Sequence, residues 1–537
     1  MPSHRTGTRP AAPAAVNVEV NRQPAAIAAV LEDAAHYPGG YTAGIARPRS
    51  EAEVATLTRQ THRLLPIGAQ SSLTGGATPM GEVVLSTDRL DRVIDISTDE
   101  VTLQPGVPLT VLKEQLAGQG LFYPPVPTFD GAFAGGVVAT NAAGATTFKY
   151  GSTRDWVRRL TVVLADGDVL DLVRGEVLAH PDGYFEIQTA DGLRRVPVPR
   201  YRMPDVPKCS AGYFARPEMD LVDLFVGSEG TLGIITEITF AVQPRLPKSC
   251  LVWLPLPHEA EAIALVGTLR AAAQATWRMR DPHGIDVAAI EQLDRRSLEL
   301  VRNDGANQRY GVFAPDDAEV ALLVQVDLPS DATLGSDEAY AQISKSLDYG
   351  APDTALVRLC RLFAKMGVLE RAEIALPSEL HRQGQLFALR EAVPEAVNRL
   401  VGEAKQTVDS AIEKTAADMI VPFPRLAESL EIFREAFDRR GLDYAIWGHI
   451  SDGNVHANVI PRTLGEVRRG WESILDCGHK IVSLGGCPLA EHGVGRNRVK
   501  QELLRQLYGK EGITDMRCVK AALDPEGKLA PGVLFSA

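Results

Sequence analysis

Short apolar runs separated by glycine-rich turns dominate the chain from residue 44 to residue 246. They predict strands at 64–69, 82–87, 92–96, 101–106, 160–173 and 233–242. Apolar residues at helical spacing predict helices at 51–63 and 109–120. The proline-rich stretch 174–220 predicts an insertion of loops and a hairpin. This region is therefore expected to be an α+β domain built on two small sheets.

Longer helical patterns alternate with single strands from residue 247 to residue 495. The helices are expected at 258–275, 335–348, 355–367, 378–401 and 425–440, and the strands at 321–329, 416–422 and 444–450. Strands interrupted by helices of this length predict a second α+β domain, with an antiparallel sheet covered by helices. Residues 496–537 return to a helical pattern, and we expect this C-terminal segment to pack on the first domain.

The first 43 residues are interpreted as a tail followed by a leading helix. The start is rich in Ala, Pro and Arg, which favours a disordered tail over a secretory signal with a continuous apolar core. No run of eighteen apolar residues occurs anywhere in the sequence, so no membrane span is predicted. We expect a cytoplasmic protein that makes at most peripheral contact with the inner membrane.

Composition narrows the classes of partner and cofactor. A formal net charge of −12 provides no basic excess to neutralise phosphates, which argues against nucleic acid. The 6 cysteines are scattered and form no C-x-x-C pair. This pattern favours reduced thiols and argues against a disulfide framework or an iron–sulfur cluster. A redox cofactor would have to be held by other groups.

Three glycine-rich segments fall in the first domain. The loop 66–76 carries small hydroxyl residues among its glycines and could turn backbone N–H groups towards a diphosphate, although it is neither a P-loop nor a Rossmann turn. The run 123–144 is so rich in Gly and Ala that either a flat group or another backbone is expected to approach it closely, and a planar ring system fits. The turn Gly-Ser-Glu-Gly-Thr at 227–231, which precedes a strand, is hard to explain by packing alone.

The order GAQSSLTGG, TNAAG, KYG, LADG and GSEGTLG resembles the vanillyl-alcohol-oxidase (PCMH-type FAD-binding) superfamily, most closely its D-lactate dehydrogenase / glycolate oxidase subunit branch. The resemblance implies a two-subdomain FAD-binding domain over 44–246, a substrate or cap domain over 247–495 and a C-terminal helix returning to the FAD domain. It also implies non-covalent FAD, because no His or Cys lies in the first loop. The residues implied to contact FAD are Ile67, Gly68, Ala69, Gln70, Ser71, Ser72, Pro127, Thr128, Gly135, Gly136, Asn141, Ala142, Gly144, Tyr150, Gly151, Glu229, Gly230, Gly233, Ile234 and Ile235.

Two histidine-containing loops in the second half predict a metal centre. The segments 448–458 and 490–495 read GHISDGNVHAN and AEHGVG. Two imidazoles and one carboxylate suit a divalent metal, with zinc or manganese preferred, and leave coordination positions for a 2-hydroxy acid. His492 could accept the hydroxyl proton as a general base. His479 matches no motif and is expected on a helix surface.

The resemblance assigns these residues individually. It implies that His449, His456 and Glu491 are metal ligands and that His492 is the base. Asn458 is implied to contact the substrate, and Arg390 to bind its carboxylate. Ser451 departs from the glycine usual in the family, and we expect the change to be tolerated. Residues 415–418 lack a lysine found in some relatives, which weakens the case for a dicarboxylate substrate.

The function expected is FAD-dependent oxidation of a D-2-hydroxy acid, such as D-lactate or glycolate, to the 2-oxo acid, with hydride passing to flavin N5. Alternatives left open are a flavin oxidase using O2 directly and a flavin-binding subunit of an electron-transfer complex. A non-redox alkyl-transfer synthase would require a histidine-rich stretch where this chain has Ala490-Glu-His492. The sequence does not distinguish quinone, cytochrome, electron-transfer flavoprotein or O2 as acceptor, nor a homodimer from a monomer.

Overall fold

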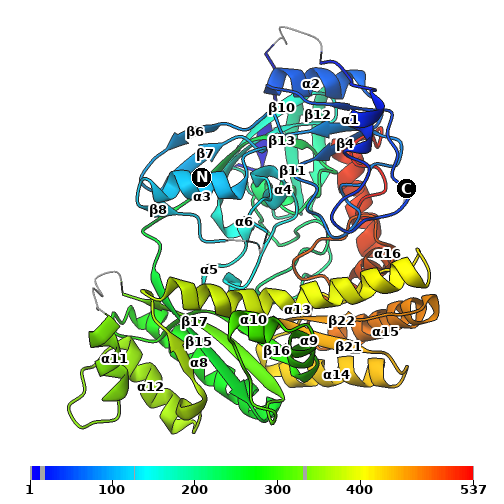
Figure 1. The fold of residues 1–537 in the computed structure, drawn as a ribbon. Coiled ribbons are helices and arrows are strands. Elements are labelled where there is room, and N and C mark those ends of the chain that lie inside the picture. The colour runs from blue at the N-terminus through cyan, green and yellow to red at the C-terminus, as the bar shows by residue number, and fades with distance from the viewer. Residues whose placement is uncertain (1–2, 13–17, 126, 128, 330–335, 536–537) are drawn as a thin grey trace. The chain divides into compact units, whose positions relative to one another are not determined.

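The structure is a computed structural model that describes residues 3–12, 18–125, 127, 129–329 and 336–535 (Figure 1). The chain forms two compact units. Unit 1 comprises residues 1–144, 151–246 and 487–537, and unit 2 comprises residues 145–150 and 247–486. One of these boundaries lies between residues 246 and 247. Residues 487–495 were expected in the substrate domain but lie in unit 1, where the Ser210 N–H donates to the Leu489 carbonyl.

The strands of unit 1 form two principal sheets, in agreement with the predicted α+β class. They are β1 (Arg5–Gly7), β2 (Arg9–Pro10), β3 (Gly44–Ala46), β4 (Leu64–Ile67), β5 (Val83–Ser86), β6 (Val93–Ile96), β7 (Glu100–Leu103), β8 (Leu121–Phe122), β9 (Val157–Val163), β10 (Asp168–Val173), β11 (Tyr184–Thr189), β12 (Gly192–Pro197), β13 (Ile234–Ala241) and β14 (Gln243–Pro244). One sheet has the order β2–β10–β9–β13–β7–β6, and a parallel sheet has the order β3–β5–β4. Strands β1, β11 and β12 form a third sheet, and β8 pairs with β14.

The helices of unit 1 are α1 (Pro24–Ala28), α2 (Glu51–Gln60), α3 (Leu109–Ala117), α4 (Ala134–Ala139), α6 (Thr153–Trp156), α7 (Leu221–Phe225) and α16 (Arg498–Leu523). The two helices predicted by range in this unit, 51–63 and 109–120, correspond to α2 and α3. The Ser50 hydroxyl caps α2 by accepting from the Glu53 N–H. The C-terminal helix α16 contacts β12, so the C-terminal segment does return to this unit.

The expectation of a disordered N-terminal tail is wrong for the described residues 3–12. Strand β1 pairs in parallel with β11, and β2 pairs antiparallel with β10. The Arg5 guanidinium forms an ion pair with Glu186, and that of Arg9 with Glu51 and Asp171. Arg5, Arg9 and Pro10, whose residue types suggested disorder, therefore belong to strands that pair at sheet edges with partners distant in sequence.

Unit 2 is an antiparallel sheet covered by helices, as predicted. Its strands are β15 (Lys248–Leu256), β16 (Asp286–Asp294), β17 (Val320–Leu328), β18 (Glu373–Ala375), β19 (Thr415–Ala416), β20 (Met419–Ile420), β21 (Tyr444–His449) and β22 (Asn454–Val459). They follow the order β18–β15–β17–β16–β21–β22–β19, with β20 also paired to β22. The helices are α5 (Thr147–Tyr150), α8 (Glu259–Met279), α9 (Arg295–Asn303), α10 (Ala306–Tyr310), α11 (Ser336–Ser344), α12 (Ala355–Lys365), α13 (Leu380–Thr407), α14 (Leu426–Asp438) and α15 (Leu464–Ser483), with 3-10 turns η1 (Leu369–Arg371) and η2 (Phe423–Arg425).

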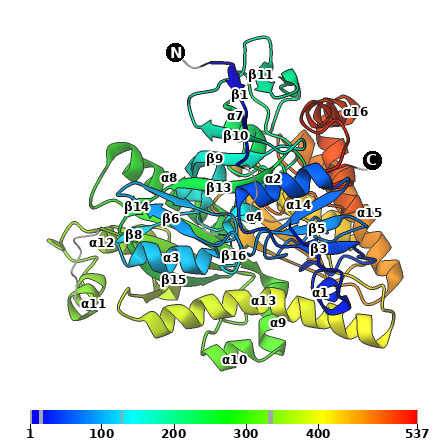
Figure 2. The same cartoon turned by 90° about the horizontal axis from the view of Figure 1, so that it is seen from above.

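Helices α9, α10 and α13 cover one face of this sheet, and Figure 2 shows α9 and α10 beside α13. Trp253, Leu323 and Trp447 on the strands pack with Leu389 and Val397 of α13 in one buried cluster. Helix α8 contacts β15, β16 and β17. Within the described part of the chain, we find no helix with the length and apolar character needed to cross a membrane.

Candidate active site

Three segments of unit 1 surround a cavity of about 270 Å³. The first is the loop after β4, the second is the segment that leads into α4, and the third is the turn that leads into β13. Each contributes mainly backbone and small side chains, and the three correspond to the glycine-rich segments identified in the sequence. The cavity therefore owes its shape to segments whose small side chains let their backbones come close together.

The loop after β4 is held in a fixed conformation by its own glutamine. Gln70 has a positive φ of 52°, and its side-chain amide donates to the carbonyls of Val30 (3.0 Å) and Ala77 (2.9 Å). The Ser72 and Thr74 hydroxyls are hydrogen-bonded at 2.9 Å. Ser71 and Ser72 line the cavity. Such a loop can present hydroxyls and backbone N–H groups to an anion.

Glycines allow the other two segments to lie close to neighbouring prolines. A Cβ on Gly135 would lie 2.5 Å from Cβ of Pro105, and one on Gly230 would lie 2.7 Å from Cγ of Pro66. A Cβ on Gly136 would meet no protein atom within 4 Å, although Gly136 lines the cavity. The Glu229 N–H donates to the Ala139 carbonyl (2.8 Å), which fixes the turn against α4. The surface at Gly136 is thus left flat and uncovered by protein.

Fifteen of the residues predicted to contact a flavin line this cavity: Ile67, Gly68, Ala69, Gln70, Ser71, Ser72, Pro127, Gly135, Gly136, Ala142, Glu229, Gly230, Gly233, Ile234 and Ile235. Asn141 instead lines a second cavity of unit 1, where its side-chain oxygen accepts from the Arg154 N–H (2.9 Å). Tyr150 belongs to unit 2, and its hydroxyl donates to Asp327 (3.1 Å). Gly144 and Gly151 lie on either side of the segment 145–150 that belongs to unit 2. Thr128 lies outside the described residues.

The predicted base and one predicted metal ligand line the same cavity of unit 1. Glu491 and His492 both contribute to its wall, and His492 Nε2 lies 3.6 Å from Glu491 Oε1. The fully buried Lys208 ammonium donates to Glu491 Oε2 at 2.9 Å. A buried carboxylate needs such a cation or a metal to compensate its charge. Lys208 was not predicted from the sequence.

The Glu229 carboxylate fixes the backbone that follows His492. Its two oxygens accept from the N–H groups of Val494 and Gly495, each at 2.8 Å. Burial raises the pKa of Glu229 to about 7, although these two N–H donors and Lys500 act in the opposite direction. Because Glu229 also lines the cavity, its charge state affects the electrostatic environment there.

In unit 2, the hairpin of β21 and β22 carries both predicted ligand histidines. His449 is fully buried, and its Nδ1 lies 2.5 Å from Glu291 Oε1. Glu291 Oε2 accepts from Nε and Nη2 of Arg390, each at 2.8 Å, and Arg390 Nη1 donates to Glu391. Burial alone would raise the pKa of Glu291, but Arg390 and His449 hold it well below its ordinary value. His449 is thereby oriented by a carboxylate, as metal-ligating histidines usually are.

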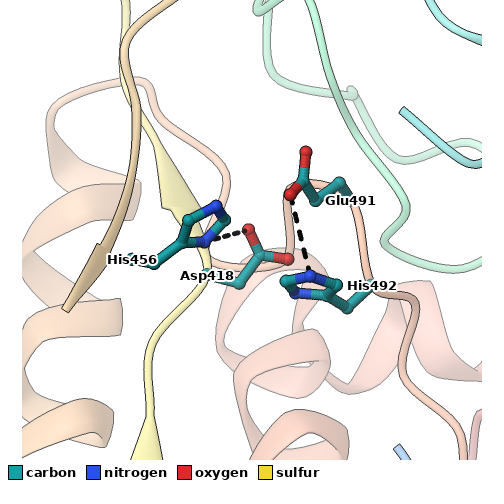
Figure 3. A group of neighbouring side chains, drawn as sticks. All are labelled: Asp418, His456, Glu491 and His492. Atoms are coloured by element: carbon teal, nitrogen blue, oxygen red, sulfur yellow. Dashed lines mark ion pairs between the residues drawn. The ribbon is translucent and has the colours of Figure 1, made fainter. Parts of the chain in front are cut away.

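His456 lies beside a second carboxylate of unit 2. Its Nδ1 is 3.6 Å from Asp418 Oδ1, and Figure 3 draws this pair together with the Glu491–His492 pair of unit 1. Asn454 donates to Asp418 Oδ1 (3.2 Å), and Asn458 is buried and donates to the His456 carbonyl (2.9 Å). Asp418 and His456 each offer a ligand atom suited to a divalent cation.

Two known families match parts of this chain. Residues 42–172 match the family described as "FAD binding domain", and residues 256–534 match "FAD linked oxidases, C-terminal domain". The chain belongs to the FAD linked oxidases. The cavity of unit 1 fits the cofactor of this family, because it combines an anion-binding loop with a flat glycine surface at Gly136.

Curated relatives of this FAD linked oxidase align over nearly its whole length. Glycolate oxidase subunit GlcD of Bacillus subtilis is 29% identical over 499 residues, which covers 91% of this chain and 88% of that protein. D-2-hydroxyglutarate dehydrogenase of Xanthomonas citri is 28% identical (91% and 89%), and D-lactate dehydrogenase of Archaeoglobus fulgidus is 26% identical (91% and 90%). A solved alkyldihydroxyacetonephosphate synthase shares the fold, with a TM-score of 0.56, 16% identity and coverage of 92% of this chain and 77% of that one.

Three charged residues of this FAD linked oxidase that contact predicted site residues within their own unit were missed by sequence reasoning: Lys208, Glu291 and Asp418. Each is an isolated charge, and no motif surrounds it. By contrast, Ser451 was noted as a departure, and its hydroxyl accepts from the Ile290 N–H (3.1 Å), which ties the hairpin turn to β16. His479 is exposed on α15, as expected.

Proposed function

We propose that this FAD linked oxidase oxidises a small D-2-hydroxy acid, such as D-lactate or glycolate, to the corresponding 2-oxo acid. One observation carries the proposal: within unit 1, Glu491 and His492 line the cavity that the predicted flavin-binding residues form. A carboxylate–imidazole pair at that place can act on a substrate next to a flavin. The names of the relatives, which include a D-lactate dehydrogenase and a glycolate oxidase subunit, support this class of substrate.

The loss of a hydride and a proton converts the hydroxy acid to the oxo acid. FAD, when bound, supplies the hydride acceptor at N5, and a divalent cation supplies a Lewis acid for the hydroxyl and carboxylate oxygens. His492 accepts the hydroxyl proton, since imidazole is the side chain best suited to proton transfer near neutral pH. Lys208 holds Glu491 in position by its ammonium–carboxylate contact.

We assign the cation to His449, His456 and Glu491, with zinc or manganese preferred. The donor set fits, because two imidazoles and a carboxylate are borderline ligands that leave positions for substrate. The contact of His449 Nδ1 with Glu291 would orient this ring for metal binding, as a carboxylate does for many metal-ligating histidines. Asp418, beside His456, is a further ligand candidate of the same unit.

Arg390 and Asn458 are assigned to the substrate. A guanidinium suits a carboxylate, and the pairing of Arg390 with Glu291 and Glu391 keeps it in a fixed orientation. No lysine occurs among residues 415–418 to bind a second carboxylate. We therefore propose a monocarboxylate and expect 2-hydroxyglutarate to be a poor substrate.

The direct test is anaerobic titration of the flavin-loaded protein with D- and L-2-hydroxy acids, following flavin absorbance with and without a chelator. D-lactate or glycolate should bleach the flavin, L-lactate should act weakly, and the chelator should slow the reaction. Failure of every hydroxy acid to reduce the flavin would refute the proposed function. Full activity in protein stripped of metal would refute the metal assignment.

A His492→Ala variant should keep its flavin and lose reduction by substrate by a factor of roughly 10²–10⁴. His479→Ala is the matched control, since His479 is exposed on α15. Rapid-mixing absorbance measurements give the reduction rate of each variant. An unchanged rate in His492→Ala would show that another group takes the proton.

A further inference from the structure

Two cysteines of unit 1 lie in contact although they are 278 residues apart in sequence. The Sγ atoms of Cys209 and Cys487 are separated by 3.5 Å. The segments that carry them run side by side, because the Ser210 N–H donates to the Leu489 carbonyl at 3.0 Å. Neither cysteine is part of a disulfide. The contact is thus fixed by backbone pairing as well as by the side chains.

The two thiols differ in their access to solvent. Cys487 is fully buried, and its Sγ contacts the Leu489 carbonyl at 3.2 Å. Cys209 is partly exposed and lines a cavity of about 370 Å³, which Arg154 and Arg174 also line. A small polar reagent could therefore reach Cys209 before it reaches Cys487.

The surroundings of Cys209 favour its thiolate, which is the reactive form. Its Sγ lies 3.8 Å from the Tyr508 hydroxyl, in addition to the contact with Cys487. The hydrogen bond with Cys487 lowers the pKa of Cys209 to about 7 against the opposing effect of burial. Burial raises the pKa of Cys250 and of Cys477 to about 12, so those thiols are protected.

We propose that Cys209 and Cys487 form a dithiol site that hydrogen peroxide oxidises to a disulfide. In the first step the Cys209 sulfur attacks the peroxide, the O–O bond breaks, and a sulfenic acid and one water form. In the second step the Cys487 sulfur attacks Cys209, the S–O bond breaks, the S–S bond forms and a second water leaves. The two thiols lose two electrons and two protons, and the peroxide accepts them.

Disulfide formation would require little movement of the two cysteine side chains. A disulfide is about 2.05 Å long, so the sulfurs must approach by roughly 1.5 Å. Lys208, which binds Glu491, directly precedes Cys209, and Cys487 lies four residues before Glu491. The disulfide would therefore join the two segments that carry this ion pair. The modification itself needs neither substrate nor metal, so it stands independently of the proposed function.

The test is peroxide treatment of the reduced, flavin-loaded protein, followed by alkylation and non-reducing peptide mass spectrometry. We expect a Cys209–Cys487 linked peptide, with two hydrogen atoms lost from the intact mass, that disappears after treatment with a dithiol reductant. Cys487→Ser should instead accumulate a sulfenic acid at Cys209 that a cyclic diketone traps. Cys209→Ser should leave Cys487 unoxidised, because the accessible thiol is gone.

Cys518→Ser is the matched control, since Cys518 is exposed, and it should retain the linked peptide. Flavin absorbance and circular dichroism establish that each variant is folded. Absence of the linked peptide while Cys518 becomes oxidised would overturn the proposal. So would trapping of sulfenic acid at Cys487 but not at Cys209.

Discussion

The cavity of unit 1 and the charged cluster of unit 2 are made of different chemical groups. The cavity wall is mostly backbone and small side chains, as at Gly135 and Gly136. The cluster consists of ionisable side chains, with Glu291 between Arg390 and His449. The cavity is therefore sensitive to added atoms, whereas the cluster is sensitive to the removal of a charge. Substitutions in each region test this contrast.

Glu291→Gln should have the largest effect. It leaves the buried Arg390 guanidinium without its main counter-charge, which we expect to lower the free energy of unfolding by about 3–5 kcal/mol. It also weakens the orientation of His449, so metal affinity should fall by roughly 10–100-fold. Urea unfolding and metal titration measure the two effects.

Glu391→Gln is the matched control for this substitution. Glu391 also accepts from Arg390, but its side chain is 43% exposed. An ion pair so open to solvent contributes about 0–1 kcal/mol. Equal losses of stability in the two variants would mean that burial does not decide the strength of these pairs.

The glycines of α4 provide the converse test. In Gly136→Ala the new methyl group meets no protein atom within 4 Å, so the apoprotein should be as stable as the wild type. The methyl should instead weaken FAD binding by about 1–3 kcal/mol through overpacking. Gly135→Ala should destabilise the apoprotein by a similar amount, because its Cβ would lie 2.5 Å from Pro105.

Fluorescence titration with FAD and urea unfolding of the apoprotein separate these two outcomes. Wild-type FAD affinity in Gly136→Ala would show that the cofactor does not contact this surface of α4. Unchanged apoprotein stability in Gly135→Ala would show that the backbone can retreat from Pro105.

The same contrast explains which parts of the site could be predicted. Where backbone geometry requires glycine, the requirement can be recognised in the sequence. Gly230 has a φ of 71° and lies against Pro66. Its position in the GSEGTLG segment predicts that it belongs to a binding turn. Glu291 cannot be recognised in this way, since its partners His449 and Arg390 are 158 and 99 residues away. Only the antiparallel pairing of β16 with β21, in which Glu291 lies opposite His449, brings Glu291 to this histidine.

The prediction of a disordered N-terminal tail was wrong for the same reason. Arg9 and the neighbouring prolines are typical of an unstructured tail when their partners are unknown. Strand β2 forms because β10, more than 150 residues later, offers an edge, and Asp171 on that strand offers a counter-charge. Local composition predicts elements that local interactions stabilise. It does not predict elements that exist only through such long-range contacts.

Glu229 combines features of both regions, because it is an ionisable residue in the glycine-lined cavity. Its substitution by Gln should have the smallest effect on the free energy of unfolding. Its pKa of about 7 in the folded protein lies above the ordinary value of 4.5, so between these values the folded chain binds more protons than the unfolded chain. Its contribution to stability is therefore present at low pH and is lost as the pH rises through 7. Relative to Glu229→Gln, the wild type should lose on the order of 1 kcal/mol of unfolding free energy between about pH 5.5 and 7.

Urea unfolding across this range measures the difference, with the exposed Glu114→Gln as control. A difference that stays constant with pH would show that the N–H donors of Val494 and Gly495 keep the carboxylate ionised throughout.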